Sequence, residues 1–529
     1  MDGFYTSHWI VTTLLALPVL GSALVFLVPE TRARVVALIV SLLELGLAIP
    51  LFWTVSPTAT CRVPGILGPL AWGPKVVPLA NCTAIPWLPD WGIFYRVGLD
   101  GLSLVLVLLA VGLLPLMVLG SWTYIQRRQR TFYAMLLLLT TGVIGVFVAF
   151  DLFLFYVFWE MMLIPMYFLI GIWGGERRIY AAVKFFLYTT FGSLLMLVAI
   201  LVLVHRTWRA TGVLSFHYFD LLHTPLTLEQ QLWLFAAFAL AFAIKVPIVP
   251  FHTWLPAAHW QAPTAGSVVL AGVLLKMGVY GLLRFALPYF PDAATHPVVV
   301  MVLLGLGVVG VIYGAWVAAV QEDAKRLVAY TSVAHLGYAV VGLFALTTES
   351  VQGAVVLMLA HGLSTPMLFF LLGMLYERRH TYRIADYGGL ATSLPLWSTA
   401  LVVAALASVG LPMLNNFVGE FLVLLGAAQA RFLYAVLAGT GVILSAVYML
   451  WLVQRAFYGP APDAVRHHVT DMNGREWALV MPLIVMMVWM GVGPQSFLPP
   501  ISQQSRQTLE IVLEKPAAQK SAQEVAHAR

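Results

Sequence analysis

Six ionisable side chains lie inside long apolar runs of this sequence, where a charge is costly. They are Glu160, Lys245, Lys276, His335, His361 and Glu420. A charge at the centre of a membrane span costs roughly 2.5–3.5 kcal/mol on insertion scales, so such residues usually serve ions, protons or substrates. Lysine, histidine and glutamate separated by hydroxyl groups and trapped water would make a relay. These residue types therefore predict a path for protons or cations.

The strongest local signal is an interrupted apolar run that contains Lys245. Three prolines follow this lysine in KVPIVPFHTWLP, and Lys276 lies near the middle of the next run. A proline inside a helix removes a hydrogen bond, and a broken helix persists in a membrane only where protein or a wet cavity surrounds it. Glu160 has the opposite charge, so an ion pair with Lys245 that forms and breaks would change the affinity of the lysine for its proton. A purely structural salt bridge is the alternative.

Other polar residues have simpler explanations. His252 and His259 flank the interruption and are expected near the inner mouth of the path, with a packed core histidine as the alternative. The same alternative applies to His335 and His361. Four further charges lie near the ends of runs, where snorkelling or helix capping explains them. These four are Lys184, Arg284, Asp100 and Asp151.

The composition is that of a polytopic membrane protein. Of 529 residues, 61% are hydrophobic and 10% are charged, whereas soluble domains have about 25% charged residues. The net charge of +6 is spread over short loops, so it does not indicate a nucleic acid partner. No CxxC motif, P-loop or GxGxxG after a strand is present, so the sequence shows no nucleotide, flavin or iron–sulfur site.

The apolar runs predict an all-α fold with about fourteen transmembrane helices. They fall near 9–28, 35–55, 101–121, 132–149, 152–173, 182–204, 232–250, 266–287, 298–320, 327–346, 352–375, 396–428, 431–453 and 477–497. The run 396–428 is long and contains GLPMLNN, which predicts a second broken helix.

The cations predict the orientation of the chain. With an external N-terminus, the richer loops face inside, so both termini are expected outside, on the periplasmic side of a bacterial inner membrane. The inside loops would hold residues 32–34, 127–130, 177–178, 325–326, 378–383 and 455–466. Cys61 and Cys82 are the only cysteines and share the external loop 56–99. A disulfide and two free thiols are both compatible with that placement.

A weak internal repeat supports this organisation. ALAFAIKVP (239–247) and ALASVGLP (405–412) lie five spans apart, so the second copy would enter the membrane from the opposite side. This predicts two inverted five-helix repeats, each with a broken helix. The expected divisions are 1–131 for the N-terminal helices and external loop, 132–287 and 298–453 for the repeats, and 454–529 for the last helix and tail.

Several long motifs resemble one family. FWEMMLIPMYFLIGIWGG (158–175), the segment 245–285, KRLVAYTSVAHLGY (325–338), VGEFL (418–422) and VGLDGLSL (97–104) are similar to the antiporter-like proton-pumping subunits of respiratory complex I, the NADH–quinone oxidoreductase. The resemblance covers about residues 90–460. Glu420 favours the M branch of that family, the counterpart of mitochondrial subunit 4, because the L and N branches usually carry lysine there.

The resemblance implies roles for the six residues. Glu160 and Lys245 would be a carboxylate–lysine pair, Lys276 the central relay lysine, and Glu420 the carboxylate on the exit side; His335 and His361 would continue the polar axis. It also implies partners in the lipid bilayer, namely neighbouring antiporter-like subunits. No cofactor is expected in this chain, because NADH, FMN, iron–sulfur clusters and quinone would belong to other subunits.

Two departures from the family pattern bear on the path. Ala257 stands where relatives often have an acidic residue, and Met413 and Asn416 stand where LPGLNGF-like motifs have glycine. Three other functions share the charges: a subunit of a multi-protein cation/proton antiporter, the matching subunit of a hydrogenase or photosynthetic NDH-type complex, and a scaffold whose charges only fix helix packing.

Overall fold

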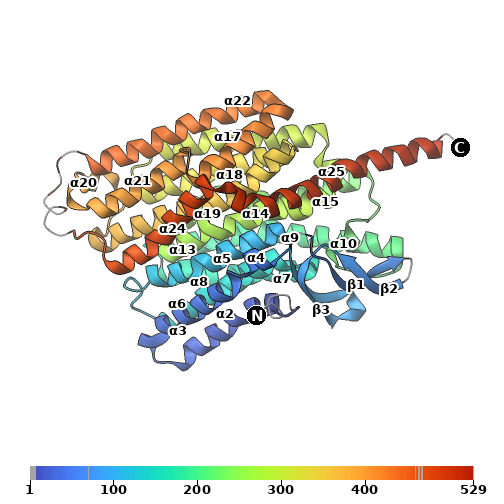
Figure 1. The fold of residues 1–529 in the computed structure, drawn as a ribbon, viewed down its shortest axis with the longest axis horizontal. Coiled ribbons are helices and arrows are strands. Elements are labelled where there is room, and N and C mark those ends of the chain that lie inside the picture. The colour runs from blue at the N-terminus through green and yellow to red at the C-terminus, as the bar shows by residue number, and fades with distance from the viewer. Residues whose placement is uncertain are drawn as a thin grey trace.

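A computed structural model describes residues 8–56, 58–68, 71–458, 460, 462, 465 and 469–527. Its helices run side by side along the long axis of the molecule (Figure 1). In this described part, 13 helices are long and apolar enough to cross a membrane. The prediction of a helical polytopic membrane protein is therefore confirmed.

The N-terminal part of the chain contains two β-hairpins and four helices. Their bounds are α2 (Ile10–Leu27), α3 (Ala33–Ala48), α4 (Leu51–Thr54) and α5 (Gly101–Gly120). The predicted loop 56–99 is in fact two antiparallel hairpins, formed by β1 (Cys61–Gly68) with β2 (Ala71–Val77) and by β3 (Ala80–Leu88) with β4 (Ile93–Leu99). Short strands rich in Pro and Gly lack the alternation that would reveal them in a sequence. Cys61 and Cys82 form a disulfide that joins β1 to β3.

The first set of five membrane segments contains the first broken helix. Its elements are α6 (Gln129–Val148), α7 (Leu152–Met161), α8 (Leu163–Trp173), α9 (Arg178–Thr211), α11 (Leu228–Lys245), α12 (Trp254–Gln261), α13 (Thr264–Val269), α14 (Leu275–Gly281) and α15 (Leu287–Tyr289), with short helices α10 (Tyr218–Leu221) and α16 (Pro291–Ala294). Two π-helical turns, η3 (Leu270–Leu274) and η4 (Leu282–Ala286), join α13, α14 and α15 into one span. That span is wholly buried inside the bundle.

The second set of five contains the second broken helix. Its elements are α17 (Pro297–Ala319), α18 (Ala324–Phe344), α19 (Thr348–Arg379), α20 (Leu390–Ser393), α21 (Pro395–Val409) and α22 (Asn415–Phe457); α24 (Gly474–Val492) and α25 (Leu498–His527) follow. Helix α22 is interrupted at Arg431, where φ is −148° and ψ is 67°. When its first part is grouped with α21, the segments number fourteen, as predicted. The inverted relation of the two sets stays a prediction.

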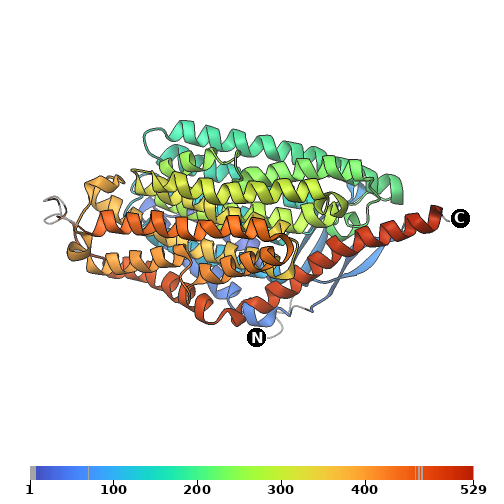
Figure 2. The ribbon, with the colours of Figure 1, turned by 90° about the horizontal axis from the view of Figure 1, so that it is seen from above.

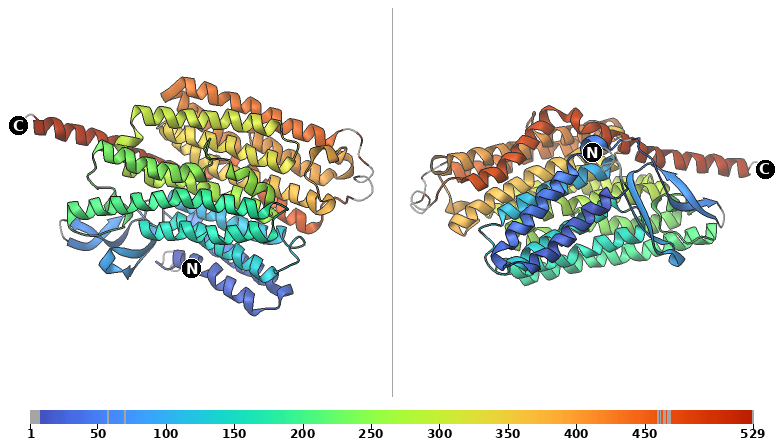
Figure 3. Two further views of the ribbon diagram at one scale, coloured as in Figure 1. Left: turned by 180° about the vertical axis from the view of Figure 1, so that it is seen from behind. Right: turned by 60° about the horizontal axis from the view of Figure 1, so that its bottom comes forward.

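The two ends of the bundle differ in character. The hairpins and the projecting part of α25 lie at one end (Figures 2 and 3). His8 contacts Cys82 of β3, so the described N-terminal residues reach the same region. The opposite end carries cationic loops that contact one another, because Arg34 donates to the Trp122 carbonyl and Trp173 donates to the Arg127 carbonyl. Residues 459, 461, 463, 464 and 466 of the predicted 455–466 loop lie outside the described part.

Buried charges hold the hairpins to the bundle. Arg96 pairs with Asp151 at 2.9 Å, and Lys75 pairs with Asp220 at 2.9 Å. Burial lowers the pKa of His217 to about 4, so its ring is neutral at pH 7 beside Asp220. Asp151 also accepts hydrogen bonds from the first backbone N–H groups of α7. This cluster fixes the start of the helix that carries Glu160.

Candidate functional site

Four of the six predicted residues form one continuous row. The Lys276 Nζ atom lies 2.6 Å from His361 Nδ1. The rings of His361 and His335 have centroids 5.6 Å apart, and His335 Nδ1 lies 3.2 Å from Glu420 Oε1. The row therefore runs from α14 through α19 and α18 to α22, across neighbouring helices of the bundle (Figure 1). All four side chains are buried.

A π-helical turn presents Lys276 to this row. Lys276 is the second residue after η3, and its ammonium donates to the Ala271 carbonyl inside that turn. π-Turns within α-helices are frequent at functional sites because they rotate side chains and free carbonyls. Here the turn supplies an acceptor for a lysine that has no carboxylate partner among the described residues.

The second break brings Glu420 to the end of the row. Helix α21 ends at Val409, and Gly410 follows with φ of +81°, a conformation that favours glycine. A Cβ atom at Gly410 would lie 2.5 Å from Glu420 Oε2. Ser408 Oγ lies 3.2 Å from His335 Nε2. The missing side chain at Gly410 therefore leaves space for the Glu420 carboxylate, and Ser408 adds a hydroxyl group to the row.

The first break places Lys245 in apolar surroundings. Helix α11 ends at Lys245, and Trp254 of α12 donates to the free Ile244 carbonyl at 2.8 Å. The Lys245 ammonium lies 3.7 Å from Met162 Sδ and 5.3 Å and 5.5 Å from the ring centroids of Trp159 and Phe185. Aromatic faces attract a cation more weakly than a carboxylate does. This lysine has therefore no strong partner within the described part of the chain.

Glu160 and Lys245, for which the sequence predicts an ion pair that forms and breaks, are separated in this structure. No nitrogen–oxygen distance of 4.0 Å or less joins them among the described residues, although the charge of Lys245 acts on Glu160. Glu160 is half-buried, and Tyr156 and Ser193 are the hydroxyl groups that interact with it. Helices α7 and α11 do contact each other, because the rings of Trp159 and Phe242 have centroids 5.6 Å apart, but the two charged side chains do not meet at this contact.

Two buried basic groups extend from Lys276 toward the cationic end. His259 is fully buried rather than exposed at a mouth, and its ring stacks on Phe369 at 4.7 Å. Neither of its ring nitrogens has a hydrogen-bond partner among the described residues. Lys325, assigned to a loop from the sequence, is also buried and donates to the Ala262 carbonyl at 2.6 Å. The charges of Lys325 and Lys276 both act on His259.

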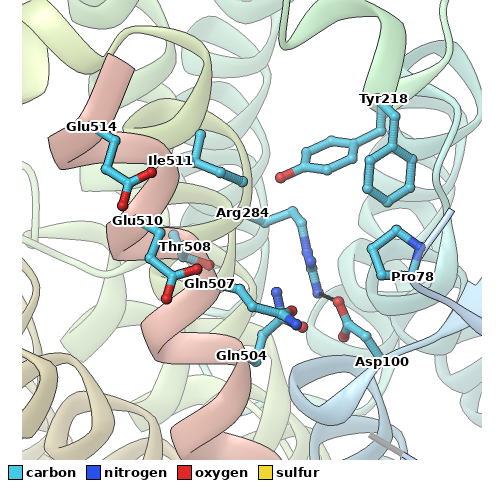
Figure 4. Close-up of a pocket in the computed structure, with 11 residues that line it drawn as sticks. Pro78, Asp100, Tyr218, Arg284, Gln504, Gln507, Thr508, Glu510, Ile511 and Glu514 are labelled. Carbon is cyan, nitrogen blue, oxygen red and sulfur yellow. Dashed lines mark ion pairs between the residues drawn. The ribbon is translucent and has the colours of Figure 1, made fainter. Parts of the chain in front are cut away.

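The charges at span ends are structural, with one correction. Asp100 caps α5 and Asp151 caps α7, as expected. Arg284 does not snorkel, because it is buried and paired with Asp100 at 2.5 Å (Figure 4). The pair lies against a cavity of about 420 Å³ that α25 covers from the side, with Gln504, Gln507, Glu510 and Glu514 facing it. Lys184 is half-buried beside tyrosine rings, which fits snorkelling.

Family models match most of the chain. The model described as NADH:quinone oxidoreductase/Mrp antiporter, transmembrane, matches residues 149–445. The model described as NADH-ubiquinone oxidoreductase chain 4, amino terminus, matches residues 79–145. Together they include all six predicted site residues and the hairpin that precedes α5.

Named relatives and solved structures agree with these models. NADH-quinone oxidoreductase subunit M of Escherichia coli strain K12 is 46% identical over 421 residues, which covers 78% of this chain and 82% of the relative. A chain of respiratory complex I from Thermus thermophilus with bound NADH has a TM-score of 0.83 at 35% identity, covering 95% of this chain and 99% of that one. A chain of the Mrp complex from Dietzia sp. DQ12-45-1b has a TM-score of 0.79 at 22% identity, covering 94% and 52%, which shows a shared fold alone.

Proposed function

Because this chain belongs to the family of membrane subunits of NADH:quinone oxidoreductase and Mrp antiporters, we propose that it pumps protons as the M subunit of a complex I-type NADH–quinone oxidoreductase. Electron transfer from NADH to quinone takes place in other subunits, which hold the FMN and iron–sulfur clusters. The neighbouring antiporter-like subunits are its partners in the inner membrane. Both termini face the periplasm, with the cationic loops on the inner side.

The observation that carries this proposal is the buried row from Lys276 to Glu420. Each member can bind and release a proton, and the contacts of 2.6 and 3.2 Å are within hydrogen-bond range. The ring centroids of His335 and His361 are 5.6 Å apart, so proton transfer between these two rings needs the rotation of one ring or a bridging water molecule. A scaffold would need only paired charges, whereas this row places three basic side chains in succession before its single carboxylate.

Unpaired polar atoms around the row support water within it. Buried polar atoms normally have hydrogen-bond partners, and internal water supplies those that protein does not. Five such atoms in α18, α19 and α22 have none among the described residues. They are Ser332 Oγ, His361 Nε2, Thr365 Oγ1, Asn415 Oδ1 and Asn416 Nδ2. Water at these positions would connect Lys276 to Glu420 by more than one route.

In the proposed mechanism, protons are taken up from the cationic side and released on the hairpin side. Lys325 and His259 form the uptake branch toward Lys276. Lys245 gains its proton when Glu160 is distant, as the structure has them, and loses it toward Lys276 as the charges rearrange. The histidines pass the proton to Glu420, which releases it outside. Ala257 supplies no carboxylate near the uptake branch, so His259 is the main proton carrier in that branch.

The experiment measures proton pumping by the whole complex in proteoliposomes, with NADH oxidation recorded in parallel. Lys245→Ala and Glu420→Ala should each reduce pumping strongly in complexes that still assemble. Lys184→Ala is the matched control, because this lysine is half-buried beside the rings of Tyr180 and Tyr188 and lies outside the row. Unchanged pumping in both test variants would refute the mechanism.

A cation/proton antiporter subunit is the second candidate, since the Mrp complex shares the fold. Purification of the tagged chain with its partners separates the two. Partners with bound flavin and iron–sulfur clusters support the proposal. A complex of antiporter subunits without redox partners supports the alternative.

A further inference from the structure

One more carboxylic acid lies inside the membrane part of the chain, away from the row. Glu44 belongs to α3, within an apolar span that runs from Glu30 to Thr54. With a rise of about 1.5 Å per residue, it lies roughly 15–20 Å from either end of that span. This depth is near the centre of the hydrocarbon layer. The residue is outside both predicted repeats, so the proton path does not use it.

Glu44 points into the protein rather than toward lipid. Its exposed fraction is 0%, and neither carboxyl oxygen has a hydrogen-bond partner in the part of the chain that the structure describes. It shares the buried face of α3 with Ala37, Val40, Ser41 and Ala48, and this face packs against α2, α5 and α6. A lipid-facing or subunit-facing role would need an exposed side chain. The residue is therefore enclosed by this chain alone.

The helices around Glu44 offer no cation at its depth. Helices α2 and α5 contain no ionisable residue. Helix α6 contains Arg130 and Tyr133, but both lie within its first five residues at the cationic end, where α3 begins. The hydroxyl groups of Thr140 and Thr141 donate to carbonyls of their own helix. An ionised Glu44 would therefore be a bare buried charge, which costs far more than a buried neutral group.

A neutral carboxylic acid needs only an acceptor for its O–H group, and α2 supplies one nearby. Pro18 lies inside α2 and has no N–H, so the Leu14 carbonyl lacks its usual helical donor. Gly21 of α2 faces Val40, one turn before Glu44, and a Cβ there would lie 2.7 Å from Val40. Because the two helices are connected by a short turn and run antiparallel, Glu44 lies opposite the turn that contains Pro18.

An apolar groove gives access to this region from the membrane. It measures about 370 Å³ and is formed by α3, α4, α5, α19 and α24. Leu45 of α3 and Ile49, which follows the end of α3, line it one helical turn apart. Glu44 does not itself line the groove, but it precedes Leu45 in the chain, so an uncharged lipid-soluble molecule in the groove would lie against the helical turn that carries the carboxyl group.

We propose that Glu44 is a proton-binding site separate from the row, held as a neutral carboxylic acid and open to modification by lipid-soluble carbodiimides. In that reaction the acid proton moves to a carbodiimide nitrogen and the carboxyl oxygen bonds to the central carbon. The adduct rearranges to an N-acylurea, and nothing leaves. Carbodiimide labelling of this subunit would then report on Glu44 as well as on the proton path.

The test treats the intact complex with dicyclohexylcarbodiimide and measures the modified fraction of each carboxyl peptide by mass spectrometry. The peptide of Glu44 should carry the adduct, and Glu44→Gln should lose it. Glu229, at the exposed start of α11, is the control carboxylate and should stay unmodified. A water-soluble carbodiimide should instead modify Glu229 and leave Glu44 unmodified. No adduct on Glu44, at a dose that modifies other buried carboxyl groups, would overturn the proposal.

A second measurement separates a neutral acid from a hidden ion pair. Glu44→Gln keeps a neutral side chain of the same size, so the melting temperature of the complex should shift by less than about 2 °C. Glu44→Lys places a bare cation in the same site and should lower it clearly or prevent assembly. If Glu44→Gln lowers the melting temperature as much as Glu44→Lys does, the ionised form is the native one, and this result would also overturn the proposal.

Discussion

The two broken helices present opposite kinds of site. At the first break, Lys245 has a thioether and two aromatic rings as neighbours, and Glu160 acts on it only from a distance. At the second, Glu420 contacts His335, which contacts Ser408. The same interruption therefore isolates a base in one half and connects an acid in the other. An isolated base responds to distant charges, whereas a connected acid passes protons onward.

Lys276 is the side chain that joins the halves, so its loss should have the largest effect. Lys276→Met removes the contact with His361 and should reduce coupled proton transport by roughly 10²-fold, the scale on which positioned proton-transfer groups contribute. Proton uptake per NADH oxidised in proteoliposomes measures it, with Lys184→Met as control. Equal transport in the variant and the control would mean that the halves work as separate paths.

Substitutions at the two breaks should have different effects on the free energy of unfolding: neutral or stabilising at the first break and destabilising at the second. Lys245→Met replaces an ammonium by an apolar chain of similar length in an apolar pocket, which is often neutral or stabilising. Glu420→Leu leaves His335 Nδ1 buried without its partner and should cost about 1–3 kcal/mol. Thermal unfolding of the purified complex measures both. A similar loss in both variants would contradict the contrast between isolated and connected sites.

Gly410 should tolerate a side chain poorly, because its backbone and its space both exclude one. Gly410→Ala adds a Cβ at φ of +81° and within 2.5 Å of Glu420 Oε2. We expect a loss of about 1–2 kcal/mol and slower proton transport. Gly439→Ala is the matched control in the same half, since nothing lies within 4 Å of its Cβ position. The idea fails if the two variants behave alike.

The smallest expected effect is a gain at Met413. This residue has φ of +73° and is 68% exposed, so it is strained without a compensating contact for its side chain. Met413→Gly should raise stability by about 1 kcal/mol. Met413→Ala keeps the strain and should give no gain, which makes it the control. A gain in Met413→Ala would point to the side chain rather than to the backbone.

The sequence predicted the residues of the row better than their contacts. Lys276, His335, His361 and Glu420 were expected to share a relay, and the structure brings them together. The ion pair of Glu160 and Lys245 that forms and breaks stays a prediction, because opposite charges in separate runs do not reveal how far apart the two side chains lie in one structure. Ser408 and Glu44 were missed, since a serine before a break and a single acid in an apolar run carry no periodic signal.

Length and hydropathy by themselves determined that this chain is a membrane bundle, because an apolar run of about 20 residues has few other stable states in water or lipid. Proline and glycine likewise determined where two helices break. Only the tertiary structure decided which charges meet: Lys276 and His361 are separated by 85 residues, as are His335 and Glu420. The rotation and packing of the helices determine which side chains are neighbours, and a local sequence pattern contains no information on either.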